Sequence, residues 1–429
     1  MRLAVGITCF MLCAGAPCLP GRALAQQPVP LRPVDRASAV QAALAHAASL
    51  AVAGADTAMA FAQFMTAQVR QNPTLSASYT QSAPQYHASA DLPLDLTGVR
   101  SARLSATRAG RQTAWFRFAS ARVAAALRAD TAYTLALARR ERSRLSSATA
   151  MAADSLRVIA GLRRDAGDVS DLDVDLAELN AGAEANVAAT DSLSYVTAVL
   201  ELQAAMGLGV DSVLVSPVGS LDAPSLEELG VERARSDIHV TMAAIDTGRP
   251  LAVAAAHASV DAATFSVLAE RRSVWGQPSI SAGFESGDPS GSEKGLLATI
   301  GVALPLPVLD RNRGPIAQAE AARGRASAEL ELAARENRIG VALARRSLVL
   351  ALERVTRDEQ LVLIANSVAA RSVTAYREGA SSLPAVLQAQ RDARDVLANY
   401  VGDLAGAWVA AASLRALTIT EYSPELPTR

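Results

Sequence analysis

Four aspartates, Asp168, Asp171, Asp173 and Asp175, fall within eight consecutive residues. Carboxylates at this density attract cations, and around an opening they would form an acidic collar that admits cations or closes the opening by electrostatics. The alternative interpretation is structural, because the dipole of a helix favours acidic residues at its N-terminus. From the residues alone, both interpretations stay open.

No catalytic constellation accompanies these aspartates. The sequence contains no Ser/His/Asp set, phosphate-binding loop or paired-carboxylate site, and its histidines lack metal-ligand spacing. We therefore predict a protein that is not an enzyme and has no cofactor and no resident metal. The histidines are His46, His87, His239 and His257.

The aspartates lie at a turn between two predicted helices, and a similar turn occurs in the second half of the chain. Gly167 can adopt the left-handed conformation that ends a helix, and Ser170 can cap the next helix, with Asp173 at the capping-box position. Gly379 and Ser382 repeat the glycine and serine of this pattern. Each turn is thus predicted to join two helices.

Arginines flank both turns, at Arg163, Arg164 and Arg377. One interpretation is that they bind acidic groups on a neighbouring chain or on a partner protein. The other is that they complement the negative C-terminal end of a helix.

Long stretches without proline predict unusually long helices on the N-terminal side of each turn. No proline occurs between Pro93 and Pro217 or between Pro315 and Pro384. Proline inside a helix costs ~3 kcal/mol, so these stretches permit helices. A helix of about 64 residues would span ~96 Å, which indicates a coiled-coil-like wall rather than a globular core.

The chain repeats itself with a constant spacing. Matching motifs lie 205 residues apart at the first position and 212 apart at the next two. We therefore predict two tandem structural repeats, 26–222 and 223–429, with strands at about 74–97 and 279–308 and long helices at about 100–207 and 315–417. The matching segments are 72–79 with 277–284, 92–94 with 304–306, and 167–170 with 379–382.

Each half contains two segments in which apolar and polar residues alternate. Strict alternation places one face of a strand in an apolar medium and the other in water. The inner face of a soluble sheet would give the same pattern, but here the polar positions carry mostly small residues, and Tyr79, Tyr86 and Phe284 lie near the turns, where membrane barrels place aromatic residues. The turn at 81–85 is short, and that at 286–295 is longer.

Four strands cannot close a barrel. The smallest membrane barrels have about eight strands, and an open edge in lipid leaves backbone groups unpaired. The chain is therefore predicted to associate with copies of itself.

The first 25 residues are predicted to be a signal peptide. Arg2 precedes an apolar stretch, and Ala23 and Ala25 form a cleavage site. All three cysteines precede residue 26, and no later run of 18 apolar residues predicts a transmembrane helix. The net charge of −1 provides no argument for nucleic-acid binding.

With these features placed, the chain resembles the TolC-like outer-membrane efflux family over nearly its whole mature length. The motifs that carry the resemblance are Asn72-Pro73, LPLDLTG at 92–98, LPLPVLDRNRG at 304–314 and YREGASSL at 376–383. The segment 305–314 is most similar to the branch that serves heavy-metal cation pumps. The lipid-attachment cysteine that many relatives carry is missing.

The resemblance implies a mainly α fold with a small β part, in which a homotrimer forms a transmembrane β-barrel of four strands per chain, continued by a long α-helical barrel. It implies an outer-membrane duct with a periplasmic extension, a passive exit for solutes, that works with a periplasmic adaptor, an inner-membrane pump of the RND type and outer-membrane lipid. The residues expected at the periplasmic tip and adaptor contact are Gly167, Asp168, Ser170, Asp171, Gly379, Ser381 and Ser382.

A periplasmic adaptor or scaffold with a long helical hairpin is the alternative function. Such a protein would interrupt its hairpin with one compact β-rich domain. In this chain, alternating strands occur at corresponding positions of both halves, which favours the duct.

Overall fold

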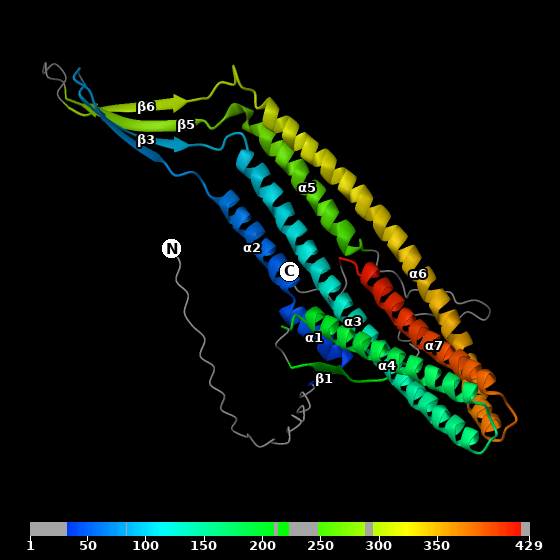
Figure 1. Ribbon diagram of the computed structural model, residues 1–429. Helices are drawn as coiled ribbons and strands as arrows, with labels where there is room; N and C mark the ends of the chain where they lie inside the picture. The colour runs from blue at the N-terminus through cyan, green and yellow to red at the C-terminus, as the bar shows by residue number, and fades with distance from the viewer. Residues whose placement is uncertain (1–31, 83, 210–212, 223–247, 288–294, 422–429) are drawn as a thin grey trace, which may run out of the picture.

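The computed structural model describes residues 32–82, 84–209, 213–222, 248–287 and 295–421. The predicted signal peptide, His239, and residues 223–247 after the proposed junction of the halves lie outside the described residues, as does the loop segment 288–294. The described chain is long and narrow, with strands at one end and two helical turns at the other (Figure 1).

The same order of elements occurs twice. The first set is α2 (Ala48–Gln68), β2 (Thr74–Tyr79), β3 (Tyr86–Pro93), α3 (Val99–Asp165) and α4 (Asp171–Ala205). The second set is α5 (Leu251–Arg272), β5 (Ser279–Ser286), β6 (Leu297–Ala303), α6 (Arg313–Arg377) and α7 (Leu383–Thr418). Corresponding helices have nearly equal lengths, with 67 residues in α3 and 65 in α6. The predicted mainly helical fold with a small β part is confirmed.

The two longest helices are held by small side chains. At 1.5 Å per residue, α3 spans about 100 Å, and it continues without a break through Gly110 and Gly161. Ala119, Ala129 and Ala136 on α3 are completely buried. Because alanine allows close approach of helix backbones, α3 packs against α4, α5 and α7 along one continuous rod.

A small second sheet near the middle of the rod was not predicted. Here β1 (Arg32–Val34) pairs in parallel with β4 (Val215–Pro217), and helix α1 (Arg36–His46) follows β1. Val34 and Val215 pack into one cluster with Tyr133 of α3 and residues of α4. This sheet ties the start of the described chain to the end of α4.

The main sheet joins the two halves. Its strand order is β2-β3-β5-β6, and every pair is antiparallel. The paired strands end at Pro93 and Ala303, before the expected limits at 97 and 308. At β6 prolines explain the difference, because Pro305 and Pro307 have no N–H to donate to a ladder.

Helix α5 and the short 3-10 turn after it, 251–275, are apolar and long enough to cross a membrane by length and composition, and so are α1 and α2 taken together across a bend of 42°. The sequence-based expectation excluded such a helix. Packing accounts for part of the composition of α5, since Leu251, Ala254 and Ala258 form a cluster with Phe116 and Ala119 of α3.

Candidate functional site

The register of the main sheet sorts its side chains onto two faces. One face carries apolar rows that continue across the strands: Leu75–Ala90–Ala282–Ile300, Leu92–Ile280–Val302 and Ala77–Ala88–Phe284–Ala298. The opposite face carries the rows Thr74–Asp91–Ser281–Gly301, Ser76–Ser89–Gly283–Thr299 and Ser78–His87–Glu285–Leu297. Apart from Leu297, the second face is free of large apolar residues, so the sheet is amphipathic as a whole.

The described chain leaves the apolar face uncovered. Leu75 and Ile300 are each 83% exposed, although leucine and isoleucine are usually buried. The rings of Tyr79 and Tyr86 pack together at the hairpin end, with their centroids 5.4 Å apart. The outer edges of β2 and β6 have no partner strand within the described sheet. Such a surface requires an apolar environment and further strands.

The polar face is held by cross-strand contacts. The hydroxyl oxygens of Ser76 and Ser89 lie 2.8 Å apart. His87 Nδ1 lies 3.3 Å from Glu285 Oε1, and its Nε2 lies 3.4 Å from the hydroxyl of Thr80. This face is therefore a hydrogen-bonded surface suited to water.

The junction between sheet and helices carries an apolar segment. Leu309 is 99% exposed, in a segment with the exposed residues Leu304, Leu306 and Val308. Asn312 then adopts a left-handed conformation, and its amide donates to the carbonyl of Glu270 at 2.8 Å. The segment 305–314 thus combines an apolar surface with an anchor for the start of α6.

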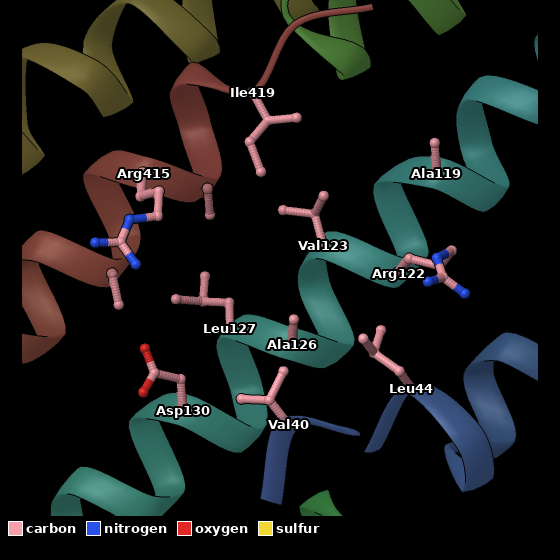
Figure 2. A pocket seen from close by; sticks show the side chains of 12 residues that line it. Val40, Leu44, Ala119, Arg122, Val123, Ala126, Leu127, Asp130, Arg415 and Ile419 are labelled. Carbon is pink, nitrogen blue, oxygen red and sulfur yellow. The ribbon is translucent and has the colours of Figure 1, made fainter. Parts of the chain in front are cut away.

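A groove lies between α1, α3 and α7, near the middle of the rod. Figure 2 shows Val40, Leu127 and Ile419 around it, and its volume is about 330 Å³. Its charged lining residues are Arg122, Asp130 and Arg415. This set contains no nucleophile beside a base.

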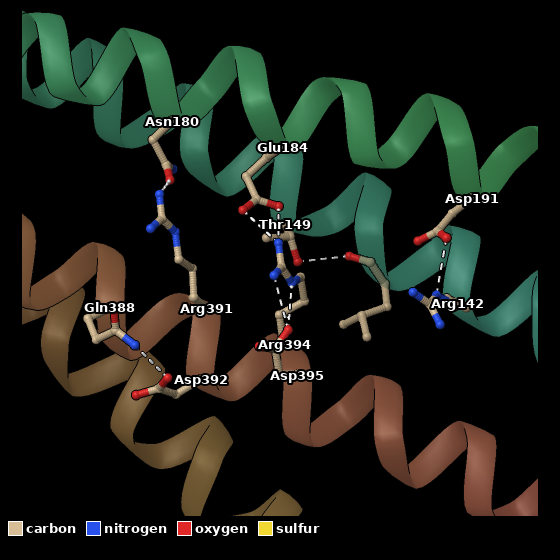
Figure 3. A network of polar contacts seen from close by, with 11 residues as sticks. Arg142, Thr149, Asn180, Glu184, Asp191, Gln388, Arg391, Asp392, Arg394 and Asp395 are labelled. Carbon is tan, nitrogen blue, oxygen red and sulfur yellow. Dashed lines mark hydrogen bonds and ion pairs between the residues drawn. The ribbon is translucent and has the colours of Figure 1, made fainter.

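A polar network joins the two halves between this groove and the turns (Figure 3). Arg394 of α7 donates to both carboxylate oxygens of Glu184 of α4 at 2.8 Å. Arg391 donates to Asn180 at 3.0 Å, and within the first half Arg142 of α3 donates to Asp191 of α4 at 3.1 Å. Desolvation lowers the pKa of Arg394, but hydrogen bonds to Asp395 and Glu184 outweigh it, so the net pKa is raised.

The two turns lie side by side at the end of the rod. Leu156, Ala177, Tyr376 and Leu383, from four different helices, pack in one cluster. Arg163 donates to the carbonyl of Tyr376 at 2.9 Å, with its guanidinium 4.9 Å from the ring centroid. Arg163 therefore binds the second half of its own chain, and neither interpretation offered for it included this contact.

The backbone of both turns has the expected form. Gly167 and Gly379 have φ angles of 81° and 74°, in the left-handed region that glycine favours. Ser170 and Asp173 form a capping box, in which each side chain accepts from the backbone N–H of the other residue. Ser382 occupies the N-cap of α7 without a side-chain cap bond.

The four aspartates differ in their surroundings. Asp173 is half-buried in the capping box, whereas Asp168, Asp171 and Asp175 are exposed. Within the described ranges, no group of three or more acidic residues or histidines is arranged to hold a metal ion. Asp171 and Asp173 both lie in the first turn of α4, where the structural interpretation places acidic residues. The three exposed carboxylates, of Asp168, Asp171 and Asp175, are those accessible to solutes.

No family model matches the chain. It is 27% identical over 369 residues to the cobalt-zinc-cadmium resistance protein CzcC of Cupriavidus metallidurans, covering 82% of this chain and 81% of the relative. Its structure is similar to CusC, described for transmembrane channel formation, with a TM-score of 0.71, 15% identity and coverage of 89% and 91%. It is equally similar to the outer membrane protein VceC of Vibrio cholerae, with a TM-score of 0.71, 18% identity and coverage of 89% and 96%.

The chain has the TolC-like fold. The predicted resemblance to the TolC-like family is thus confirmed, and the sheet and the paired turns are the two ends of that fold.

The sequence-based search missed the polar network of this TolC-like chain. A usable signal was present, because Asn180 and Glu184 are four residues apart and Arg391 and Arg394 are three apart, which places each pair on one helix face. The search also treated His87 and Glu285 separately, although both occupy polar positions of alternating strands at their hairpin ends.

Proposed function

We propose that the chain is the outer-membrane channel component of a tripartite efflux system and serves as a passive exit duct. The observation that carries this proposal is the amphipathic sheet, with its uncovered apolar face and two unpaired edges. Each backbone group left unpaired in lipid costs several kcal/mol, so the edges must pair with other copies. Three copies of a four-stranded sheet supply twelve strands, which makes a homotrimer the natural closure.

The helical rod then extends from the membrane into the periplasm. The paired turns at its far end are the surface for a periplasmic adaptor, which links the duct to an inner-membrane pump of the RND type. The relative's name, a cobalt-zinc-cadmium resistance protein, supports divalent metal cations as the exported solutes. The proposed contact residues remain Gly167, Asp168, Ser170, Asp171, Gly379, Ser381 and Ser382.

The function of an adaptor or scaffold is not favoured. A water-soluble hairpin protein would cover the apolar rows of its sheet, whereas Leu75 and Ile300 point into open space.

Membrane fractionation and channel recording test the duct. We expect the full chain in the outer membrane, a trimer by native mass spectrometry in detergent, and stepwise conductance in planar bilayers. A soluble, folded monomer without detergent, or a chain found only with the inner membrane, would contradict the proposal.

The exposed aspartates at the tip form the proposed acidic collar. Three copies of Asp168, Asp171 and Asp175 would place nine carboxylates around one opening. Replacing these three with asparagine, while keeping Asp173 in its capping box, should lower the preference for cations over anions, measured as the reversal potential in a KCl gradient. Asp154→Asn on the exposed side of α3 is the control. Unchanged selectivity in the triple variant would rule out the collar.

A further inference from the structure

His87 lies on the polar face in the row nearest the hairpin turns. Its row neighbours are Ser78 on β2 and Glu285 on β5. Both side chains of the His87–Glu285 pair are about one-third exposed, so solutes that pass this face can reach them.

Both ring nitrogens of His87 have polar neighbours. Nε2 lies 3.4 Å from the hydroxyl of Thr80, which also lies within hydrogen-bond distance of the carbonyl oxygens of Ser82 and Pro84. Nδ1 faces the Glu285 carboxylate.

An imidazole nitrogen and a carboxylate oxygen are both ligands that Zn²⁺ takes in proteins. Nδ1 and Oε1 lie 3.3 Å apart. Ligands about 2.0–2.2 Å from a tetrahedral Zn²⁺ are separated by about 3.4 Å, so little movement is needed to seat an ion between them.

We propose that His87 and Glu285 form a transit site for borderline divalent transition-metal ions such as Zn²⁺. This inference rests on the proposed duct, in which the polar face lines the lumen and each trimer carries three such sites. Imidazole selects these ions over the hard cation Mg²⁺. With two protein ligands and water completing the shell, the site binds weakly enough to release the ion, as conduction requires.

The groups that face His87 from β2 and the turn, Ser78 and Thr80, are uncharged. Glu285 on β5 is its charged row neighbour, and Asp91 lies two polar rows away.

Chemical protection tests binding without any need for conduction. The intact trimer in detergent is treated with diethyl pyrocarbonate, with and without Zn²⁺, and modified histidines are quantified by mass spectrometry. We expect Zn²⁺ to protect His87 at pH 7.5 and Mg²⁺ to leave it reactive, with exposed His46 reactive throughout. Lack of protection at His87, or equal protection by Mg²⁺, would overturn the proposal.

Channel recording tests the location of the site. We expect Zn²⁺ to reduce K⁺ conductance, with a half-maximal concentration that rises at least about tenfold in His87→Gln and in Glu285→Gln, since even loss of a group that supports a ligand costs 10–100-fold in metal affinity. Native mass spectrometry checks that both variants remain trimers. The matched control is His257→Gln, which removes a histidine–carboxylate pair of the same 3.3 Å separation from helix α5 and should leave the Zn²⁺ effect unchanged.

The outcomes separate the two proposals. A wild-type trimer that does not conduct would contradict the duct, while protection of His87 is measured independently. A conducting wild type whose Zn²⁺ sensitivity is the same in His87→Gln would contradict the transit site alone.

Discussion

The contacts of single residues explain how the two halves are held together near the tip. Glu184 is 5% exposed, and its charge is balanced by Arg394 from the other half of the chain. A buried carboxylate is costly unless it is paired and hydrogen-bonded. The pair therefore requires α4 and α7 to stay in contact.

Loss of the arginine should be much more harmful than loss of a surface pair. Arg394→Ala leaves Glu184 buried and uncompensated, and we expect the free energy of unfolding to fall by about 3–5 kcal/mol. The measurement is denaturant unfolding of the trimer in detergent, followed by circular dichroism. Arg157→Ala, which removes an exposed pair with Asp154, is the control and should cost less than about 1 kcal/mol. Equal effects of the two variants would show that the buried pair does not hold the halves together.

At the scale of elements, the packing of α6 on α7 contains a pair of carboxyl groups. Burial raises the pKa of Asp358, and a hydrogen bond to Asp403 and its negative charge raise it further, partly offset by Arg357 and Arg354. Oδ2 of Asp358 is buried without a partner among the described residues. We infer that a proton shared between the two carboxyl groups satisfies this oxygen.

This pair should make stability depend on pH. Between the ordinary pKa of 3.8 and the raised value, the folded chain holds a proton that the unfolded chain has lost. Stability therefore falls as the pH rises through this window and stays lower above it. Asp358→Asn keeps a donor toward Asp403 without the charge, so it should raise the melting temperature at pH 7 and flatten the dependence between pH 4 and 7.

Thermal melts followed by circular dichroism over that pH range are the measurement. Glu359→Gln changes an exposed neighbour and should leave the dependence as it is in the wild type. A lower melting temperature at pH 7 for Asp358→Asn would contradict the shared proton.

At the scale of the whole molecule, the helices have buried clusters of their own and the main sheet does not. The buried clusters lie between helices, or between helices and the small β1–β4 sheet, within the described chain. The main sheet has large exposed residues on its apolar face, and the helices also expose large apolar residues such as Leu162, Leu179 and Leu363. Both parts of the described chain therefore leave apolar surface uncovered.

Two adjacent residues of β6 provide a matched test of the two faces of the main sheet. Ile300 belongs to an apolar row and Thr299 to a polar row. Arginine on the lipid face of a membrane barrel costs about 2–4 kcal/mol near the midplane, whereas the lumen tolerates it. We expect Ile300→Arg to reduce the trimer recovered from the outer membrane severalfold and Thr299→Arg to leave it nearly unchanged, as quantified by native gel electrophoresis. The opposite ranking would mean that the apolar rows face the lumen.

Patterns with a short period were readable from the sequence alone. The proline-free stretches, the glycines before each second helix and the strict alternation in the strands predicted the helices, the turns and the amphipathic hairpins. Each is a local rule, in which a residue acts on its own backbone or on neighbours a few positions away. The repeat predicted that the two halves have the same elements, because equal spacing requires elements of similar length.

Contacts between distant segments were decided only by the tertiary structure. Three pairings depend on which elements meet in space. They are β3 with β5, β1 with β4, and Arg394 with Glu184, which lies 210 residues away in the sequence. The same holds for Arg163, whose partner is the backbone of a helix in the other half. A local pattern can indicate that a side chain needs a partner. Which residue becomes the partner depends on the packing of the whole chain.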